Sequence, residues 1–182
     1  QSVVTGHYAE VFRKQDSMLI TKNPLVAIKQ ENDTVFLASD TLMVTGKVED
    51  RDITAFYDAR LFKSDLSGKA DSIHSNEKSG LTKLIRNPVL WSGKSQITGD
   101  TIHLISNTET EKLDSLRVFE NAFMIQKDTI KGYNQIKGKE LYGFFENNEL
   151  YEVDVIKNTQ SLFYVRDDSG DLIGINKTLS AK

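Results

Sequence analysis

The sequence predicts an all-β fold made of many short antiparallel strands, and three observations lead to that prediction. β-branched and aromatic residues alternate with polar ones over short runs that recur about every 8–12 residues. Helical periodicity is nearly absent: the best candidate, 108–117, has too few apolar residues at helical spacing to bury one face. A third observation is a short motif that occurs seven times: Asp, then Ser or Thr, then an aliphatic residue.

The predicted strands follow one another with only short connections along the whole chain. Asparagine, glycine and serine mark several of the turns between them, at 76–80, 147–148 and 168–170. In chain order, the predicted strands are 8–12, 18–20, 25–29, 34–37, 41–45, 53–57, 60–62, 72–74, 81–85, 89–91, 101–105, 115–119, 123–126, 133–136, 140–144, 150–155, 160–165 and 172–175.

The Asp motif has a simple physical interpretation as a strand start. The Asp side chain caps a turn, and the hydroxyl and aliphatic residues then open a strand. Its seven copies begin at Asp16, Asp33, Asp40, Asp71, Asp100, Asp114 and Asp128. Such an excess of one triplet indicates an internal repeat.

A longer period is visible in the two prolines of the chain. Both follow an asparagine, at Asn23-Pro24 and Asn87-Pro88, and the two pairs lie 64 positions apart. Proline fixes φ and removes a hydrogen-bond donor, so a strand begins there or lies at an edge. We therefore expect a single domain, 1–182, with internal repeats at about 6–46, 68–106 and 132–176.

Composition excludes several classes of protein. A net charge of -3 and an isoelectric point near 5.7 argue against nucleic acid as the main partner. No stretch approaches eighteen consecutive apolar residues, so we expect no membrane span. The absence of cysteine excludes disulfides and thiol catalysis. Because the chain begins with Gln1 and carries no signal segment, we expect an exported protein from which a signal peptide is missing.

Candidate chemical sites have simpler structural explanations, and we expect no catalytic residue, cofactor or metal. His74 and His103 occupy matching strand positions, but exposed strand histidines are far commoner than metal pairs. Acidic turns near Asp50 and Asp168 are better explained by turn capping than by calcium. Neither a nucleophile elbow nor a phosphate-binding glycine loop occurs.

The glycine-led strand starts resemble the OstA-like, or organic solvent tolerance, family, which includes LptA-type periplasmic carriers of lipopolysaccharide. That family repeats a glycine, an acidic residue and an apolar residue at strand starts, with Val-x-Gly turns between strands. Here the matching segments are 6–10, 39–42, 68–71, 98–102 and 137–141, together with the turn at 44–46. The composition, rich in Asn, Lys, Asp and Ile, is similar to Bacteroidetes members of the family.

The resemblance implies an elongated antiparallel β-jellyroll, open at both ends, in the periplasm. It also implies that acyl chains of lipopolysaccharide lie in an apolar groove, and that edge strands join copies or other bridge proteins end to end. One departure is the segment 113–128, which lacks the glycine turns and is expected to be an insertion or a distinct edge.

Period-two alternation identifies candidate groove residues, because a folded sheet turns every second side chain inward. The strand after Asp100 places Ile102 and Leu104 on one face, and the strand after Asp40 has the same phase. In the strand beginning at Glu140, aromatic residues are expected on that face. The predicted lipid-groove residues are Leu42, Val44, Ile102, Leu104, Tyr142 and Phe144.

Charge is unevenly distributed along the chain. The segment 60–94 has an excess of basic residues, whereas 146–154 is acidic. Both are typical of solvated strand faces. The functional alternative is contact with lipid phosphates or with an acidic partner end, through Lys63, Lys69, Lys83 and Arg86.

The predicted function is a non-enzymatic periplasmic carrier or bridge component that holds lipopolysaccharide acyl chains in an apolar groove. The alternative is a cell-surface or extracellular β-repeat interaction module whose interior is a sealed core without lipid. A glycan-processing β-helix enzyme would need a cluster of carboxylates on a groove, and none is visible.

Overall fold

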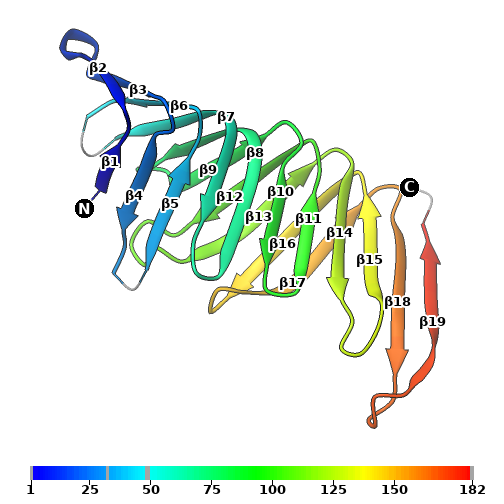
Figure 1. The fold of residues 1–182 in the computed structure, drawn as a ribbon. Coiled ribbons are helices and arrows are strands. Elements are labelled where there is room, and N and C mark those ends of the chain that lie inside the picture. The colour runs from blue at the N-terminus through cyan, green and yellow to red at the C-terminus, as the bar shows by residue number, and fades with distance from the viewer. Residues whose placement is uncertain (1, 32, 48–49, 181–182) are drawn as a thin grey trace.

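A computed structural model describes residues 2–31, 33–47 and 50–180, and confirms the all-β prediction (Figure 1). Its described part holds one antiparallel sheet of nineteen strands and one short 3-10 turn, Arg13–Gln15. The first ten strands are β1 (Ser2–Thr5), β2 (Tyr8–Phe12), β3 (Ser17–Thr21), β4 (Leu25–Lys29), β5 (Thr34–Ala38), β6 (Thr41–Thr45), β7 (Asp52–Phe62), β8 (Leu66–Asn76), β9 (Leu81–Ile85) and β10 (Val89–Ser92). The other nine are β11 (Ser95–Thr98), β12 (Thr101–Ser106), β13 (Leu113–Phe119), β14 (Ala122–Lys127), β15 (Tyr133–Gly138), β16 (Glu140–Glu146), β17 (Glu149–Ile156), β18 (Gln160–Arg166) and β19 (Leu172–Leu179).

The sheet folds over on itself into two layers, as Figure 1 shows. Layer 1 contains β2, β3, β6, the first half of β7, the second half of β8, β9, β12, β13, β16 and β17. Layer 2 contains β1, β4, β5, the remaining halves of β7 and β8, β10, β11, β14, β15, β18 and β19. β7 and β8 therefore run through both layers. This arrangement is the predicted elongated jellyroll, not closed into a barrel.

The chain crosses from layer 1 to layer 2 at five corners that share one backbone conformation. Each corner has two successive residues with positive φ, and the second is always Asn or Asp. Short polar side chains tolerate this left-handed conformation best. The pairs are Lys22-Asn23, Tyr57-Asp58, Arg86-Asn87, Glu120-Asn121 and Lys157-Asn158. The corners recur every 29 to 37 residues, which is about half the spacing of the two Asn-Pro pairs.

The return crossings from layer 2 to layer 1 stack on these corners and form one long edge, here called the seam. Backbone hydrogen bonds join the two kinds of crossing: the Asp40 N–H donates to the Tyr57 carbonyl at 3.1 Å, and the Lys139 N–H donates to the Lys157 carbonyl at 2.8 Å. At the N-terminal end, Nδ1 of His7 lies 2.7 Å from the Lys22 carbonyl oxygen. The opposite edge consists of hairpin turns and is here called the hairpin edge.

Small residues occupy the position that precedes each return crossing. They are Gly6, Ser39, Ala70, Gly99 and Gly138. A Cβ added to Gly99 would lie 2.2 Å from Cγ1 of Val118, and one added to Gly138 would lie 2.4 Å from Cγ1 of Val155. The glycine-led strand starts in the sequence thus reflect close approach of neighbouring strands at the seam.

Rows of aliphatic side chains, paired strand to strand, fill the space between the layers. The row in layer 1 runs through Ile20, Leu42, Ala55, Ile73, Leu84, Ile102, Val118 and Leu141, all 3% exposed or less. The facing row in layer 2 runs through Val26, Leu37, Leu61, Leu90, Ile97, Met124 and Ile136, with Gly68 between Leu61 and Leu90. Burying one such aliphatic side chain stabilises the fold by about 1.5–3 kcal/mol.

Several sequence predictions need correction. The segment 113–128 is neither an insertion nor an edge, because β13 pairs with β12 and β16 and β14 pairs with β11 and β15. The predicted strands 53–57 and 60–62 are one strand, β7, bent at its corner. The Asp motif at Asp128 lies in a hairpin turn, where Ile130 is 61% exposed.

Candidate functional site: a groove along the hairpin edge

A cavity of about 520 Å³ opens between the two layers at the N-terminal end of the hairpin edge. Its walls are mainly apolar and come from both layers: Val4, Val11, Met18, Val26, Val44 and Ile53. Three basic residues, Arg13, Lys47 and Arg51, also line it, against one acidic residue, Asp16. The cavity therefore combines an apolar interior with a surplus of positive charge.

A second cavity, of about 700 Å³, lies next to it towards the middle of the hairpin edge. Leu61, Leu66 and Leu104 supply apolar walls, and the hydroxyls of Ser75 and Thr82 lie 2.9 Å apart on its lining. The basic residues Lys29, Arg51 and Lys63 are balanced here by the acidic residues Asp65, Glu77 and Glu111. Ser2 and Arg51 line both cavities, so the two adjoin, and together they are here called the groove.

Four of the six predicted groove residues point between the layers. Leu42 and Ile102 are fully buried in the layer 1 row. Val44 and Leu104 lie two residues further towards the hairpin edge, where Val44 lines the first cavity and Leu104 the second. The strands that follow Asp40 and Asp100 thus have the predicted phase.

The predicted phase of β16 is wrong. Leu141 and Phe145 point between the layers and are buried, whereas Tyr142 and Phe144 lie on the outer face. The Tyr142 hydroxyl donates to Glu140 at 3.0 Å, and the Tyr142 ring lies over the guanidinium of Arg117. Tyr142 therefore covers a surface ion pair, Arg117–Glu140, instead of lining the groove.

Of the four predicted basic contacts, Lys63 lines the groove and the others lie elsewhere. Lys69 is on the outer face of layer 2, with Nζ 6.0 Å from the centre of the Trp91 ring. Lys83 is on the outer face of layer 1, opposite His74 and His103. Arg86 lies at the seam, where Nε is 3.3 Å from Oδ2 of Asp71.

Arg51 and Arg13 line the groove but were not predicted from the sequence. Both lie in or beside hairpin turns, and nothing in their local sequence distinguishes them from other surface basic residues. Their position depends on which turns of the two layers face each other across the hairpin edge, and that is set by long-range pairing.

Within 2–31, 33–47 and 50–180, no group of three or more His, Cys, Asp or Glu residues could hold a metal ion. In the acidic turn near Asp168, Asp167 accepts hydrogen bonds from the hydroxyl of Ser169 at 2.9 Å and from the N–H of Asp171 at 2.8 Å, as turn capping requires. Among those same residues, no helix is long and apolar enough to cross a membrane.

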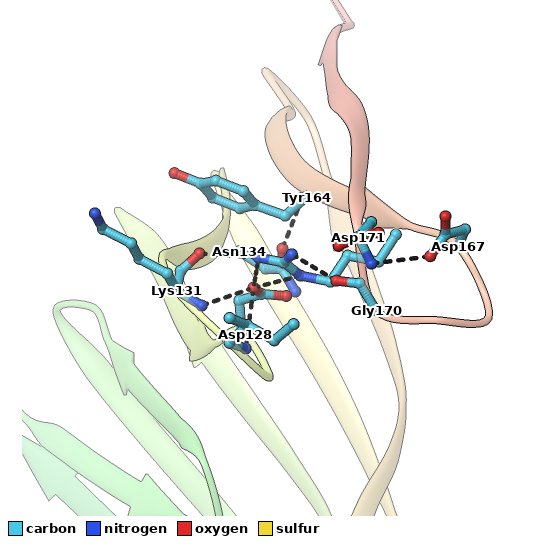
Figure 2. Close-up of polar contacts among 9 residues, drawn as sticks. Asp128, Lys131, Asn134, Tyr164, Asp167, Gly170 and Asp171 are labelled. Carbon is cyan, nitrogen blue, oxygen red and sulfur yellow. Dashed lines mark hydrogen bonds and ion pairs between the residues drawn. The ribbon is translucent and has the colours of Figure 1, made fainter.

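An ion pair fastens the last hairpins of layer 2 together (Figure 2). Nε of Arg166 lies 2.8 Å from Oδ2 of Asp128, and Nη1 donates to the Gly170 carbonyl at 2.9 Å. The Asp128 side chain is 6% exposed and that of Arg166 is 15% exposed. The guanidinium and three backbone N–H groups near the turn hold the pKa of Asp128 at about 2. The β14–β15 turn is thereby joined to the β18–β19 turn.

Each end of the jellyroll presents two edge strands. Among the described strands, β1 and β2 at the N-terminal end pair on one side only, as do β17 and β19 at the C-terminal end. On β17, Glu149, Glu152 and Asp154 are exposed, so the C-terminal edge of layer 1 is acidic. Unpaired edges of this kind can accept a strand of another chain.

The fold and the groove define a class: a β-jellyroll whose apolar interior opens along one edge. A family model described as "LptA/(LptD N-terminal domain) LPS transport protein" matches residues 2–111, and the chain belongs to this family. The family consists of transport components and is not an enzyme family, and the resemblance predicted from the sequence is confirmed.

Among solved structures, the chain is similar to LptH of Pseudomonas aeruginosa, described as the LptA-homologous periplasmic component of the lipopolysaccharide transport device. The sequences are 15% identical, and the TM-score is 0.53 over 63% of this chain and 80% of that chain. At this identity the likeness shows the fold alone. No curated protein matches the chain.

Proposed function

We propose that this chain is a periplasmic bridge component that binds acyl chains of lipopolysaccharide in the groove during transport to the outer membrane. The observation that carries the proposal is the apolar first cavity, which opens to solvent between the layers and is lined by Val44 and Met18. A sealed core, as the alternative interaction module requires, would not leave such a volume. Family membership supports the transport role.

Burial of methylene groups would supply the affinity. Each CH₂ removed from water contributes about 0.8 kcal/mol, so one chain of about a dozen carbons contributes on the order of 10 kcal/mol before binding costs. The basic surplus around the first cavity, Arg13, Lys47 and Arg51, suits a lipid with an anionic head. Single polar substitutions at the rim should therefore weaken binding only mildly.

Bridge assembly would use the edge strands. The N-terminal end carries Arg13 and Lys14 beside β2, whereas β17 at the C-terminal end carries Glu149 and Glu152. Opposite charges at the two ends favour head-to-tail contact between copies or with other bridge proteins. Such contacts would extend the sheet of one molecule into that of the next.

Native mass spectrometry of the purified protein with added lipopolysaccharide tests the proposal. We expect bound lipid in the native chain, and its loss in Val44→Asp, because a carboxylate would then face the apolar cavity. Met43→Asp is the matched control, since Met43 is the preceding residue of β6 and is exposed on the outer face. Circular dichroism verifies that both variants fold. A folded native chain that binds no lipid would contradict the carrier and favour the interaction module.

A further inference from the structure

A row of basic and imidazole side chains crosses the outer face of layer 1. In the strand register, His74 of β8 lies opposite Lys83 of β9, and Lys83 lies opposite His103 of β12. Arg117 of β13 is the next member, opposite His103. The residues adjacent to Lys83 and His103 in sequence include Leu84, Ile102 and Leu104, which are buried between the layers, so the row faces outward.

Protonation of either imidazole would place like charges directly opposite each other, which is unfavourable in a sheet unless an anion offsets them. The acidic groups that face the row lie at its two ends: Asp52 on β7 near His74, and Glu140 on β16, which is bound to Arg117 at 2.8 Å. Asp154 on β17 lies opposite Tyr142, beyond that end.

Nothing acidic faces the centre of the row among the described residues. The outward neighbours of Lys83 on β9 are Leu81 and Ile85, and those of His103 on β12 are Thr101 and Ile105. Lys83 makes no ion pair within the described part of the chain. A basic side chain that has no acidic partner among such neighbours is expected at a functional position.

Aromatic rings hold the row in place. Phe56 packs edge-on against His74, with ring centres 6.1 Å apart, and Phe119 packs against His103 at 4.6 Å. Phe119 also lies under the Arg117 guanidinium, 4.3 Å from ring centre to Cζ. The two imidazoles are half-buried, so less side-chain entropy remains to be lost when a ligand binds.

The charges of the row also couple ligand binding to protonation. Burial lowers the pKa of His74, Lys83 lowers it further, and Asp52 opposes the change. Burial likewise lowers the pKa of His103, with added effects of Lys83 and Arg117. An anion placed over Lys83 would favour the protonated imidazoles, so it would raise both pKa values.

We propose that His74, Lys83 and His103 form a site for a tetrahedral dianion, the phosphate group of a ligand, on the outer face of layer 1. The Cα atoms of the three residues span about 10 Å across adjacent strands, and an anion centred over Lys83 can accept from all three side chains when the two imidazoles lean towards it. The site is separate from the groove and does not depend on acyl-chain binding. Protonation of the two histidines gives the site its second and third positive charges, so affinity for an anion that keeps its own charge rises as pH falls.

Titration of the histidine side-chain NMR signals with sulfate tests the proposal, because sulfate stays a dianion across the range. We expect saturable shifts at His74 and His103, a rise in each pKa of about one unit, and tighter binding at about pH 5.5 than at about pH 8. His7, the third histidine, lies at the seam and serves as an internal control. Equal shifts at all three histidines would overturn the site.

Paired lysine variants make the test specific. Lys83→Met should weaken sulfate binding at least about tenfold, whereas Lys69→Met, on the other layer, should leave it unchanged. Equal effects of the two variants, or acetate binding as tightly as sulfate at equal ionic strength, would refute a tetrahedral-anion site. Inorganic phosphate and vesicles of phosphatidylcholine with phosphatidic acid then distinguish a free phosphate from a lipid-borne one.

Discussion

The two long edges of the jellyroll are built differently, although the same strands end at both. At the seam, four of the five return crossings donate backbone hydrogen bonds to the neighbouring corner, and small residues such as Gly99 allow close approach. At the hairpin edge the strands end in turns, and the two cavities open there. One sheet is thus closed along one side and open along the other, and this asymmetry creates a groove inside a two-layered fold.

The groove is also confined to one part of the chain's length. Every residue that lines it, apart from Leu113, lies within 2–111, the segment that matches the family model. In the C-terminal part, a Cβ added to Gly143 would lie 2.8 Å from Cδ1 of Leu150 and 3.0 Å from Cγ of Leu116, so side chains of layer 1 pack tightly there. The C-terminal strands β18 and β19 instead expose apolar residues such as Phe163 and Ile175. We expect this part to contact partners more than cargo.

The largest loss of stability is expected when a substitution creates a cavity in the aliphatic row of layer 1. Ile102→Ala should lower the free energy of unfolding by about 2–5 kcal/mol, because Ile102 is fully buried in layer 1. Ile105→Ala, on the outer face of the same strand, should cost much less because Ile105 is 41% exposed. Urea unfolding of both variants measures the difference, and equal losses would show that the row is not the stabilising core.

An intermediate effect is expected from a methyl group at the seam. Gly99→Ala should cost about 1–3 kcal/mol, since the new Cβ would lie 2.2 Å from Cγ1 of Val118. Gly174→Ala is the matched control, because its Cβ would meet nothing within 4 Å. Thermal unfolding should therefore separate the two variants. If Gly99→Ala is as stable as Gly174→Ala, the strands at the seam can move apart to admit a methyl group, and close approach is not required there.

A smaller, pH-dependent effect is expected at the Asp128–Arg166 pair. The pKa of Asp128 is about 2 in the folded chain, below its ordinary value of 3.8. The pair therefore stabilises the fold above about pH 4, and that contribution is lost as the pH falls towards about 2.

Asp128→Asn should remove this part of the pH dependence from melting curves. Arg60→Met, which breaks the exposed Arg60–Asp58 pair, should change the melting temperature little at any pH. A native chain whose acid sensitivity matches that of Asp128→Asn would contradict this assignment.

The strands could be predicted where local turn chemistry marks their ends. Asn23-Pro24 and Asn87-Pro88 both lie at corners of the seam, and β4 and β10 begin directly after the two prolines, as the shared Pro position predicts. The equivalent corners at Asn121 and Asn158 lack proline and went unrecognised. β11 was missed because Ser95–Thr98 contains one aliphatic residue, Ile97, too few to show alternation.

The sequence does not predict which face of β16 is buried, because Tyr142 packs against another side chain on the outer face. Tyr142 covers Arg117, and a bulge between Phe144 and Phe145 shifts the register against β17. Alternation shows that a strand has two faces, but not which one is buried when both carry apolar side chains. The groove itself depends on pairing between distant hairpins, so its basic lining residues have no local signal.

The most direct test of the groove is site-specific photocrosslinking to lipopolysaccharide from two adjacent pairs of residues. A photoreactive side chain at Val44 or Leu104 would lie in the groove, whereas one at Met43 or Ile105 would lie on the outer face. We predict much stronger crosslinks to lipid from Val44 and Leu104 than from Met43 and Ile105. Equal crosslinking from both members of each pair, or from the outer positions alone, would contradict a lipid-binding groove between the layers.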